Sequence, residues 1–120
     1  MDIVAATKHN NLYWINDGAG IFARSNIGDF TADGGRSRDL VIADMDGDSD
    51  LDIAVANQNN ERNFLYFNDG YGLFQRVLKG DFVKDTGISY GLEAADIDGD
   101  GCFLYNVTVF VPALYRSRYA

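Results

Sequence analysis

The sequence DMDGDSDLD, residues 44–52, places a carboxylate at every second position and a glycine at the fourth. Two carboxylates about 5 Å apart repel each other by roughly 1 kcal/mol in water, so this pattern is costly unless a cation offsets the repulsion. The side chains of the loop offer hard oxygen ligands, and the loop contains neither His nor Cys. This donor set favours Ca²⁺ over Zn²⁺ or Cu²⁺, and a flexible loop suits Ca²⁺ better than Mg²⁺.

The loop supplies five candidate ligands for this cation. We expect the side chains of Asp44, Asp46, Asp48 and Asp52 to bind it, and Asp50 to contribute its backbone carbonyl. A solvated acidic turn is the alternative interpretation. Alternate spacing together with a glycine is typical of a ligand pattern rather than of a merely acidic composition. The sequence therefore predicts a calcium site here.

A helix–loop–helix calcium motif also begins with alternating Asp residues, but its pattern does not fit. That motif needs Gly at the sixth position and Glu at the twelfth, where this chain has Ser49 and Val55. The flanking segments 40–43 and 53–56 are short, β-branched apolar runs, which are typical of strands. We therefore expect the acidic loop to be a tight turn between two strands.

Comparison of the sequence with itself reveals an internal repeat. Three pairs of segments align in the same order along the chain: 2–6 with 52–56, 12–22 with 64–74, and 44–48 with 96–100. Such a period predicts one supersecondary unit per repeat. Within one period the apolar runs and turn residues predict four strands, at about residues 38–43, 52–57, 63–68 and 73–77.

Aromatic residues and turns recur at equivalent places in the repeat. Trp14 aligns with Tyr66 and Phe22 with Phe74, which favours a role in the core for all four. The Asn-Asp-Gly sequence that occurs in both copies combines residues that tolerate positive φ, and it predicts a hairpin turn.

The second copy of the acidic loop is incomplete. Asp96, Asp98 and Asp100 repeat the first three carboxylates, but Leu104 occupies the place of the last one. We expect this second site to bind a cation more weakly, because it lacks one carboxylate ligand.

Composition limits the possible partners. Eighteen acidic and ten basic residues give a net charge of −8, which makes nucleic acid a poor partner. A hydrophobic content of 47% is ample for a globular core. The sequence shows no signal peptide and no apolar run near the ~18 residues that would span a membrane, so we expect no membrane insertion.

Two longer connections, residues 24–37 and 76–89, are rich in Gly and Asp and have no clear period. Connections of this kind often carry the recognition surfaces of a repeat protein. Their basic residues could meet an acidic ligand, or they could simply be exposed to solvent: Arg24, Arg36, Arg76, Lys79 and Lys84.

The motif DxDGDxDLD followed by IAVAN and then NxLYxNDGxGxF resembles the FG-GAP/VCBS repeat of integrin-α-like β-propellers. The resemblance covers residues 2–101. It implies an all-β fold, a partial β-propeller of about two four-stranded antiparallel blades with calcium loops. The calcium ligands of that family carry over to Asp44, Asp46, Asp48, Asp50 through its carbonyl, Asp52, Asp96, Asp98 and Asp100.

The resemblance also implies an organisation and a function. We expect residues 1–43 to form an incomplete first repeat, residues 44–101 a second repeat and the start of a third calcium loop, and residues 102–120 a divergent apolar tail. The implied function is a secreted or cell-surface module for binding or adhesion, without catalysis. Its expected partners are a protein or carbohydrate ligand, adjacent blades, or further copies of the chain.

Two other functions remain open at this stage. The chain could be a non-catalytic piece of a larger propeller-containing hydrolase or lyase, because a fold does not confer an activity. It could also be a truncated product without a function of its own.

Overall fold

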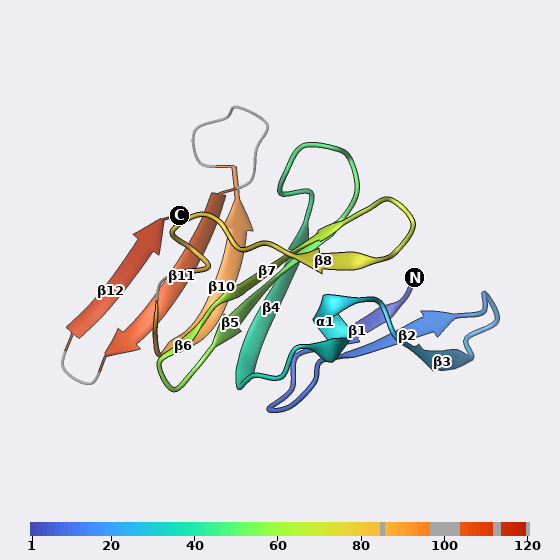
Figure 1. Ribbon diagram of the computed structural model, residues 1–120, viewed down its shortest axis with the longest axis horizontal. Coiled ribbons are helices and arrows are strands. Elements are labelled where there is room, and N and C mark those ends of the chain that lie inside the picture. The colour runs from blue at the N-terminus through green and yellow to red at the C-terminus, as the bar shows by residue number, and fades with distance from the viewer. Residues whose placement is uncertain (85, 97–103, 112–113, 120) are drawn as a thin grey trace.

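The computed structural model describes residues 1–84, 86–96, 104–111 and 114–119. Within this part of the chain three antiparallel sheets follow one another across the molecule in sequence order (Figure 1). The first sheet contains β1 (Ile3–Ala5), β2 (Leu12–Asn16) and β3 (Phe22–Ser25). The second contains β4 (Ser37–Ala43), β5 (Asp52–Asn57), β7 (Phe64–Asn68) and β8 (Phe74–Arg76). The third contains β10 (Ser89–Ala95), β11 (Leu104–Val111) and β12 (Leu114–Tyr119).

The remaining elements are short. A two-stranded ribbon pairs β6 (Glu61–Arg62) with β9 (Thr86–Gly87), and a single helical turn, α1 (Asp29–Ala32), lies between β3 and β4. No helix in the described part of the chain is long and apolar enough to cross a membrane.

The all-β, antiparallel fold predicted from the repeat is confirmed. The four strands predicted for one period are β4, β5, β7 and β8, and each predicted boundary lies within one residue of the observed one. The predicted count of about two four-stranded blades stays a prediction. The described residues form one four-stranded sheet, two three-stranded sheets and the two-stranded ribbon. β11 and β12 pair with β10, so a further sheet follows the four-stranded one along the chain.

The two copies of the sequence repeat also form equivalent hydrogen bonds. The Asp2 carboxylate accepts from the backbone N–H of Asn16 at 3.0 Å, and the equivalent Asp52 carboxylate accepts from Asn68 at 2.9 Å. The predicted hairpin turn is confirmed, because the Asn68 side-chain oxygen accepts from the N–H groups of Gly70 and Gly72 at 3.0 and 3.2 Å. Both glycines have φ near +84°, which a residue with a Cβ rarely adopts.

The central strand β5 is buried along its whole length, because sheets pack against both of its faces. Ile53 and Val55 belong to a core cluster on the side of the first sheet. Ala54 lies in a second cluster on the side of β10, together with Leu65 and Phe82. Small alanines on one face and branched residues on the other thus let β5 pack between two layers.

The connection between the first and second sheets contains structure that the sequence did not predict. We expected residues 24–37 to be a loop, but they include α1, whose Phe30 is fully buried. The Phe30 ring meets Tyr66 edge to face, with centroids 5.5 Å apart. The Ile27 carbonyl accepts from the N–H of Phe74 at 2.9 Å, so this connection is attached to the edge of the second sheet.

The predicted core role of the recurring aromatics is right for only part of the set. Tyr66 and Phe74 are buried and Trp14 is half-buried, whereas Phe22 is 41% exposed. Phe22 and Phe74 are equivalent in sequence but not in environment. Phe74 packs in the cluster between two sheets, and nothing in the described part of the chain covers Phe22 to the same extent.

Candidate metal centre

The acidic loop connects two neighbouring strands of the four-stranded sheet, as predicted. Ala43 at the end of β4 pairs with Asp52 at the start of β5, and residues 44–51 form the turn between them. The pairing of β4 with β5 therefore fixes the position of both ends of the loop.

Three carboxylates converge within this loop. Asp44, Asp46 and Asp48 each offer one oxygen, and these atoms all lie within 4.8 Å of one another. Oxygens that bind Ca²⁺ at about 2.3–2.6 Å are separated from each other by up to roughly 5 Å, so this spacing fits a shared ion. Asp44 is half-buried, and the other two side chains are exposed. The group could hold a metal ion that enters from solvent.

Backbone N–H groups order the carboxylates. Asp44 accepts from Gly47 at 2.8 Å and from Ser49 at 2.9 Å, one bond to each carboxylate oxygen. Asp48 accepts from Asp50 at 2.9 Å. Gly47 and Ser49 both have positive φ, of 82° and 75°, and a non-glycine residue in that region carries strain. A carboxylate oxygen has more than one lone pair, so these bonds leave acceptor capacity for a cation.

Asp52 lies beneath the loop rather than with the three converging carboxylates. Its side chain is fully buried and accepts from the backbone N–H of Met45 at 2.8 Å and of Asn68 at 2.9 Å. Burial raises the pKa of Asp52, the two N–H groups partly counter that rise, and the negative charge of Asp48 adds to it. Asp52 thus connects the acidic loop to the neighbouring hairpin, and its predicted role as a metal ligand stays a prediction.

The carboxylate of Asp50 points toward the next hairpin. A Cβ placed on Gly70 would lie 2.9 Å from the Oδ2 atom of Asp50, so this side chain sits against the Gly70 backbone. Asp50 is not among the three converging carboxylates. This orientation is compatible with the predicted use of its backbone carbonyl, which also stays a prediction.

The electrostatics of the loop match a site built for positive charge. Partial removal of the Asp46 carboxylate from water raises its pKa, and a hydrogen bond with the Asp48 side chain raises it further. The backbone N–H of Asp48 partly counters this rise, and the charges of Asp52 and Asp48 add to it. The raised pKa means that the loop resists full ionisation unless a cation neutralises part of the charge.

Asn68 is a supporting residue that the sequence assigned only to a hairpin turn. Its backbone N–H donates to Asp52, and its side-chain amide donates to the Leu51 carbonyl at 3.2 Å. It therefore connects the hairpin to the end of the acidic loop. The signal that could have revealed it is the aligned Asn16, whose N–H donates to Asp2 in the same way.

The second acidic loop falls mostly outside the described residues. Asp98 and Asp100 belong to residues 97–103, which the structure does not describe, and Asp96 is described and exposed. The prediction of a second, weaker site at Asp96, Asp98 and Asp100 therefore stays a prediction.

Comparison with protein-family models gives two matches to the model described as FG-GAP-like repeat, over residues 1–55 and 44–103. The two matches overlap on the acidic loop and the start of β5, where one sequence repeat passes into the next. A search of curated protein sequences returned no match. The matched segments together span residues 1–103 of the 120 in the chain. The chain therefore belongs to the FG-GAP-like repeat family.

Proposed function

We propose that the chain is a calcium-binding repeat module of a β-propeller that serves extracellular binding or adhesion and catalyses no reaction. The observation that carries the calcium part is the convergence of three carboxylate oxygens, from Asp44, Asp46 and Asp48, within 4.8 Å of one another. Membership of the FG-GAP-like repeat family supports the propeller and the extracellular setting.

The donor chemistry suits the proposed ion. The three side chains supply carboxylate oxygens only, and Ca²⁺ prefers such hard ligands in a flexible arrangement. The bound ion would supply positive charge that offsets the mutual repulsion of the loop. Asp52, Asn68 and the hairpin that follows would hold the base of the site in place.

The proposed role of calcium is structural. The loop lies at one end of β4 and β5, and β5, like β7, contributes residues to both core clusters. Neutralising the loop would therefore stabilise the pairing of the strands that carry the core. A binding module gains from this arrangement because its recognition loops rest on a rigid sheet.

A thermal melt of the chain with calcium, with magnesium or with a chelator tests this proposal. We expect a Kd typical of extracellular modules, about 10⁻⁴–10⁻³ M. Free calcium at ten times the Kd should then raise the free energy of unfolding by roughly 1.4 kcal/mol. Magnesium should give a smaller gain because it loses its hydration shell reluctantly. Coincident melts with calcium and with chelator would contradict the proposal.

We also propose that the module associates with adjacent blades or with further copies of the chain. Apolar side chains on or beside β2 and β3 are exposed, with Ile15 at 44%, Ile21 at 68% and Phe22 at 41%. Blades of a repeat array bury such surfaces against their neighbours. Light scattering tests this proposal, which predicts a mass above that of the monomer at micromolar concentration both with and without calcium.

A further inference from the structure

A basic hollow lies at the end of the sheets opposite the acidic loop. The acidic loop follows the Ala43 end of β4. Three of the segments that line the hollow, namely the β1–β2 turn, residues 34–36 and β6, lie near the Ser37 end of β4 (Figure 1). It is a broad depression, open to solvent, with a volume of about 540 Å³.

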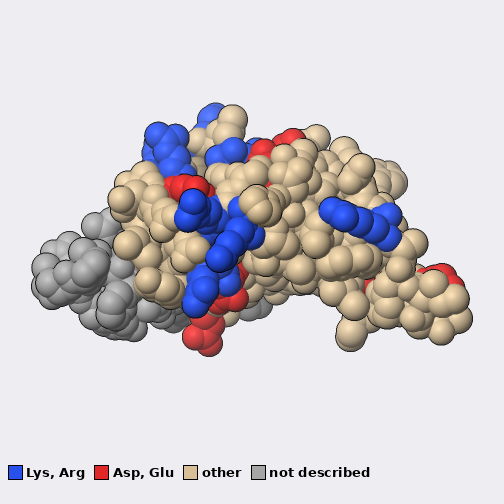
Figure 2. All heavy atoms as spheres, turned by 90° about the horizontal axis from the view of Figure 1, so that it is seen from below, with Lys and Arg blue, Asp and Glu red and all other residues tan. Residues whose placement is uncertain are grey.

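Cationic side chains from four separate segments line this hollow. Lys8 comes from the β1–β2 turn, Arg36 from the residue before β4, Arg62 from β6 and Arg76 from β8. Figure 2, which views the molecule from this side, shows Lys and Arg side chains gathered on one face. Such a gathering is notable because the whole chain has a net charge of −8.

Most of these charges lack a carboxylate partner. Arg76 forms an ion pair with Asp33, at 3.6 Å. Among the described residues, no other pair of opposite charges lies within 4.0 Å. The Arg36 guanidinium contacts a neutral group, the Asn59 side-chain oxygen, at 2.7 Å in the amide orientation that satisfies both groups. Lys8 and Arg62 are exposed. Three cations thus face one hollow, and an anion placed there would relieve their mutual repulsion.

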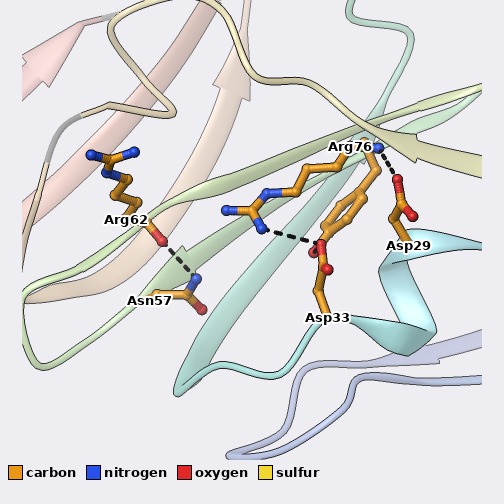
Figure 3. A network of polar contacts seen from close by, with 6 residues as sticks. Asp29, Asp33, Asn57, Arg62 and Arg76 are labelled. Atoms are coloured by element: carbon orange, nitrogen blue, oxygen red, sulfur yellow. Dashed lines mark hydrogen bonds and ion pairs between the residues drawn. The ribbon is translucent and has the colours of Figure 1, made fainter.

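The backbone around the hollow is well supported. Arg76 lies over the Phe64 ring, 3.9 Å from its centroid. Its backbone N–H donates to Asp29 at 2.8 Å (Figure 3). The Arg62 carbonyl accepts from the buried Asn57 side chain at 2.7 Å. These contacts fix the backbone of Arg62 and both backbone and side chain of Arg76, whereas the Arg62 side chain itself is exposed.

The hollow also offers acceptors beside the cations. Glu61 lines it and accepts from the Arg36 N–H through one oxygen, Oε2, at 2.7 Å. A carboxylate has a second oxygen, so Glu61 keeps acceptor capacity for a ligand through Oε1. A ligand that fits this lining therefore carries hydroxyl donors as well as negative charge.

We propose that this hollow binds an acidic saccharide, whose carboxylate meets Lys8, Arg36 and Arg62 and whose hydroxyls donate to Glu61. The inference rests on the proposed function as a binding module but does not depend on calcium occupancy. Sugar acids combine an anion with several hydroxyl donors on a compact ring, as the lining requires. An acidic peptide brings carboxylates with fewer donors for each charge.

Isothermal titration calorimetry of the whole chain at low salt tests the proposal with three probes. They are a tetramer of galacturonic acid, a neutral hexose tetramer and an oligoglutamate that carries the same charge as the acidic saccharide. We expect measurable binding of the uronate tetramer alone, weakened by added salt because exposed charges are screened. Lys8→Gln and Arg62→Gln should each weaken binding of the uronate tetramer by roughly fivefold, which is the loss of affinity expected when one exposed charge pair is removed. Lys79→Gln removes the same charge from an exposed position outside the lining and should leave binding unchanged.

Several results would overturn the proposal. They are equal binding of the neutral tetramer, oligoglutamate binding as tight as that of the uronate, and an equal loss in the Lys79→Gln control. A calcium-dependent melt of the same sample separates this proposal from the calcium one. A chain that is stabilised by calcium but binds no uronate contradicts the saccharide site alone. Uronate binding without a calcium shift contradicts the calcium assignment alone.

Discussion

Substitution of Asp52 by Ala should destabilise the fold whether or not calcium is present. The buried carboxylate accepts from the N–H groups of Met45 and Asn68, so its removal leaves two donors unpaired. A buried donor without a partner costs about 1–3 kcal/mol. The Met45 bond is buried and the Asn68 bond is partly buried, so we expect a loss of about 2–4 kcal/mol in the free energy of unfolding.

Asp48→Ala is the matched control for that substitution. Asp48 is exposed and accepts one exposed bond, from the N–H of Asp50. In chelator its removal should change the free energy of unfolding by about 0.5 kcal/mol or less. With free calcium at ten times the Kd, the Asp48→Ala variant should lose most of the roughly 1.4 kcal/mol that calcium contributes to the unmodified chain.

Urea titrations of the unmodified chain and of both variants, each in calcium and in chelator, measure the loss in the free energy of unfolding for each variant under each condition. A loss for Asp52→Ala that appears only in calcium would refute the supporting role, because Asp52 would then act as a ligand alone. A loss for Asp48→Ala in chelator as large as that for Asp52→Ala would refute the assignment of Asp48 to the cation.

Three further predictions concern other parts of the molecule. Gly28→Ala should cost at least about 2 kcal/mol, because Gly28 has φ +83° and a Cβ there would lie 2.6 Å from the Phe74 carbonyl oxygen; a urea titration measures it. Leu104→Asp should strengthen the weaker of two calcium sites, which calorimetry would detect. The pKa values of Asp46 and Asp52 are raised above 3.8, so protons should compete with calcium as pH falls through those raised values. The difference between calcium and chelator melts should therefore shrink with acidification at a higher pH than an ordinary Asp would give.

The sign of the pH effect follows from which state binds protons more tightly. A raised pKa in the folded state means that the folded metal-free chain holds these protons more tightly than the unfolded chain. Asp46 and Asp52 therefore stabilise the metal-free fold least at pH values above their raised pKa values, where both carboxylates are ionised. Calcium should stabilise the fold most in that same pH range. A calcium gain that grows on acidification would contradict this account.

Gly18→Ala is the control for Gly28→Ala. Gly18 also has positive φ, +91°, but nothing lies within 4 Å of its Cβ position. It should show the conformational cost without the steric one. Equal losses for the two variants would contradict the close approach of the connecting segment to β8.

The sequence predicted those features that short stretches determine. The boundaries of β4 and β5 follow from β-branched runs on either side of the acidic loop. The convergence of Asp44, Asp46 and Asp48 follows from alternation within a single turn. Each of these signals depends on neighbours within about ten residues.

Features that depend on distant contacts could not be predicted in this way. The turn of helix α1 has four residues, too few to show a period, and its position depends on packing of Phe30 against Tyr66. The buried position of Asp52 beside Asn68 depends on the pairing of β5 with β7. The basic hollow combines side chains from four segments, so no local pattern marks it.

Calorimetric titration of calcium into the unmodified chain and into Asp48→Ala tests the central claim most directly. The account predicts one site in the unmodified chain with a Kd of about 10⁻⁴–10⁻³ M, and loss of that site in the variant. Any second site should be much weaker. Calcium heats that are absent from the unmodified chain, or that persist unchanged in Asp48→Ala, would contradict the claim that residues 44–52 bind calcium.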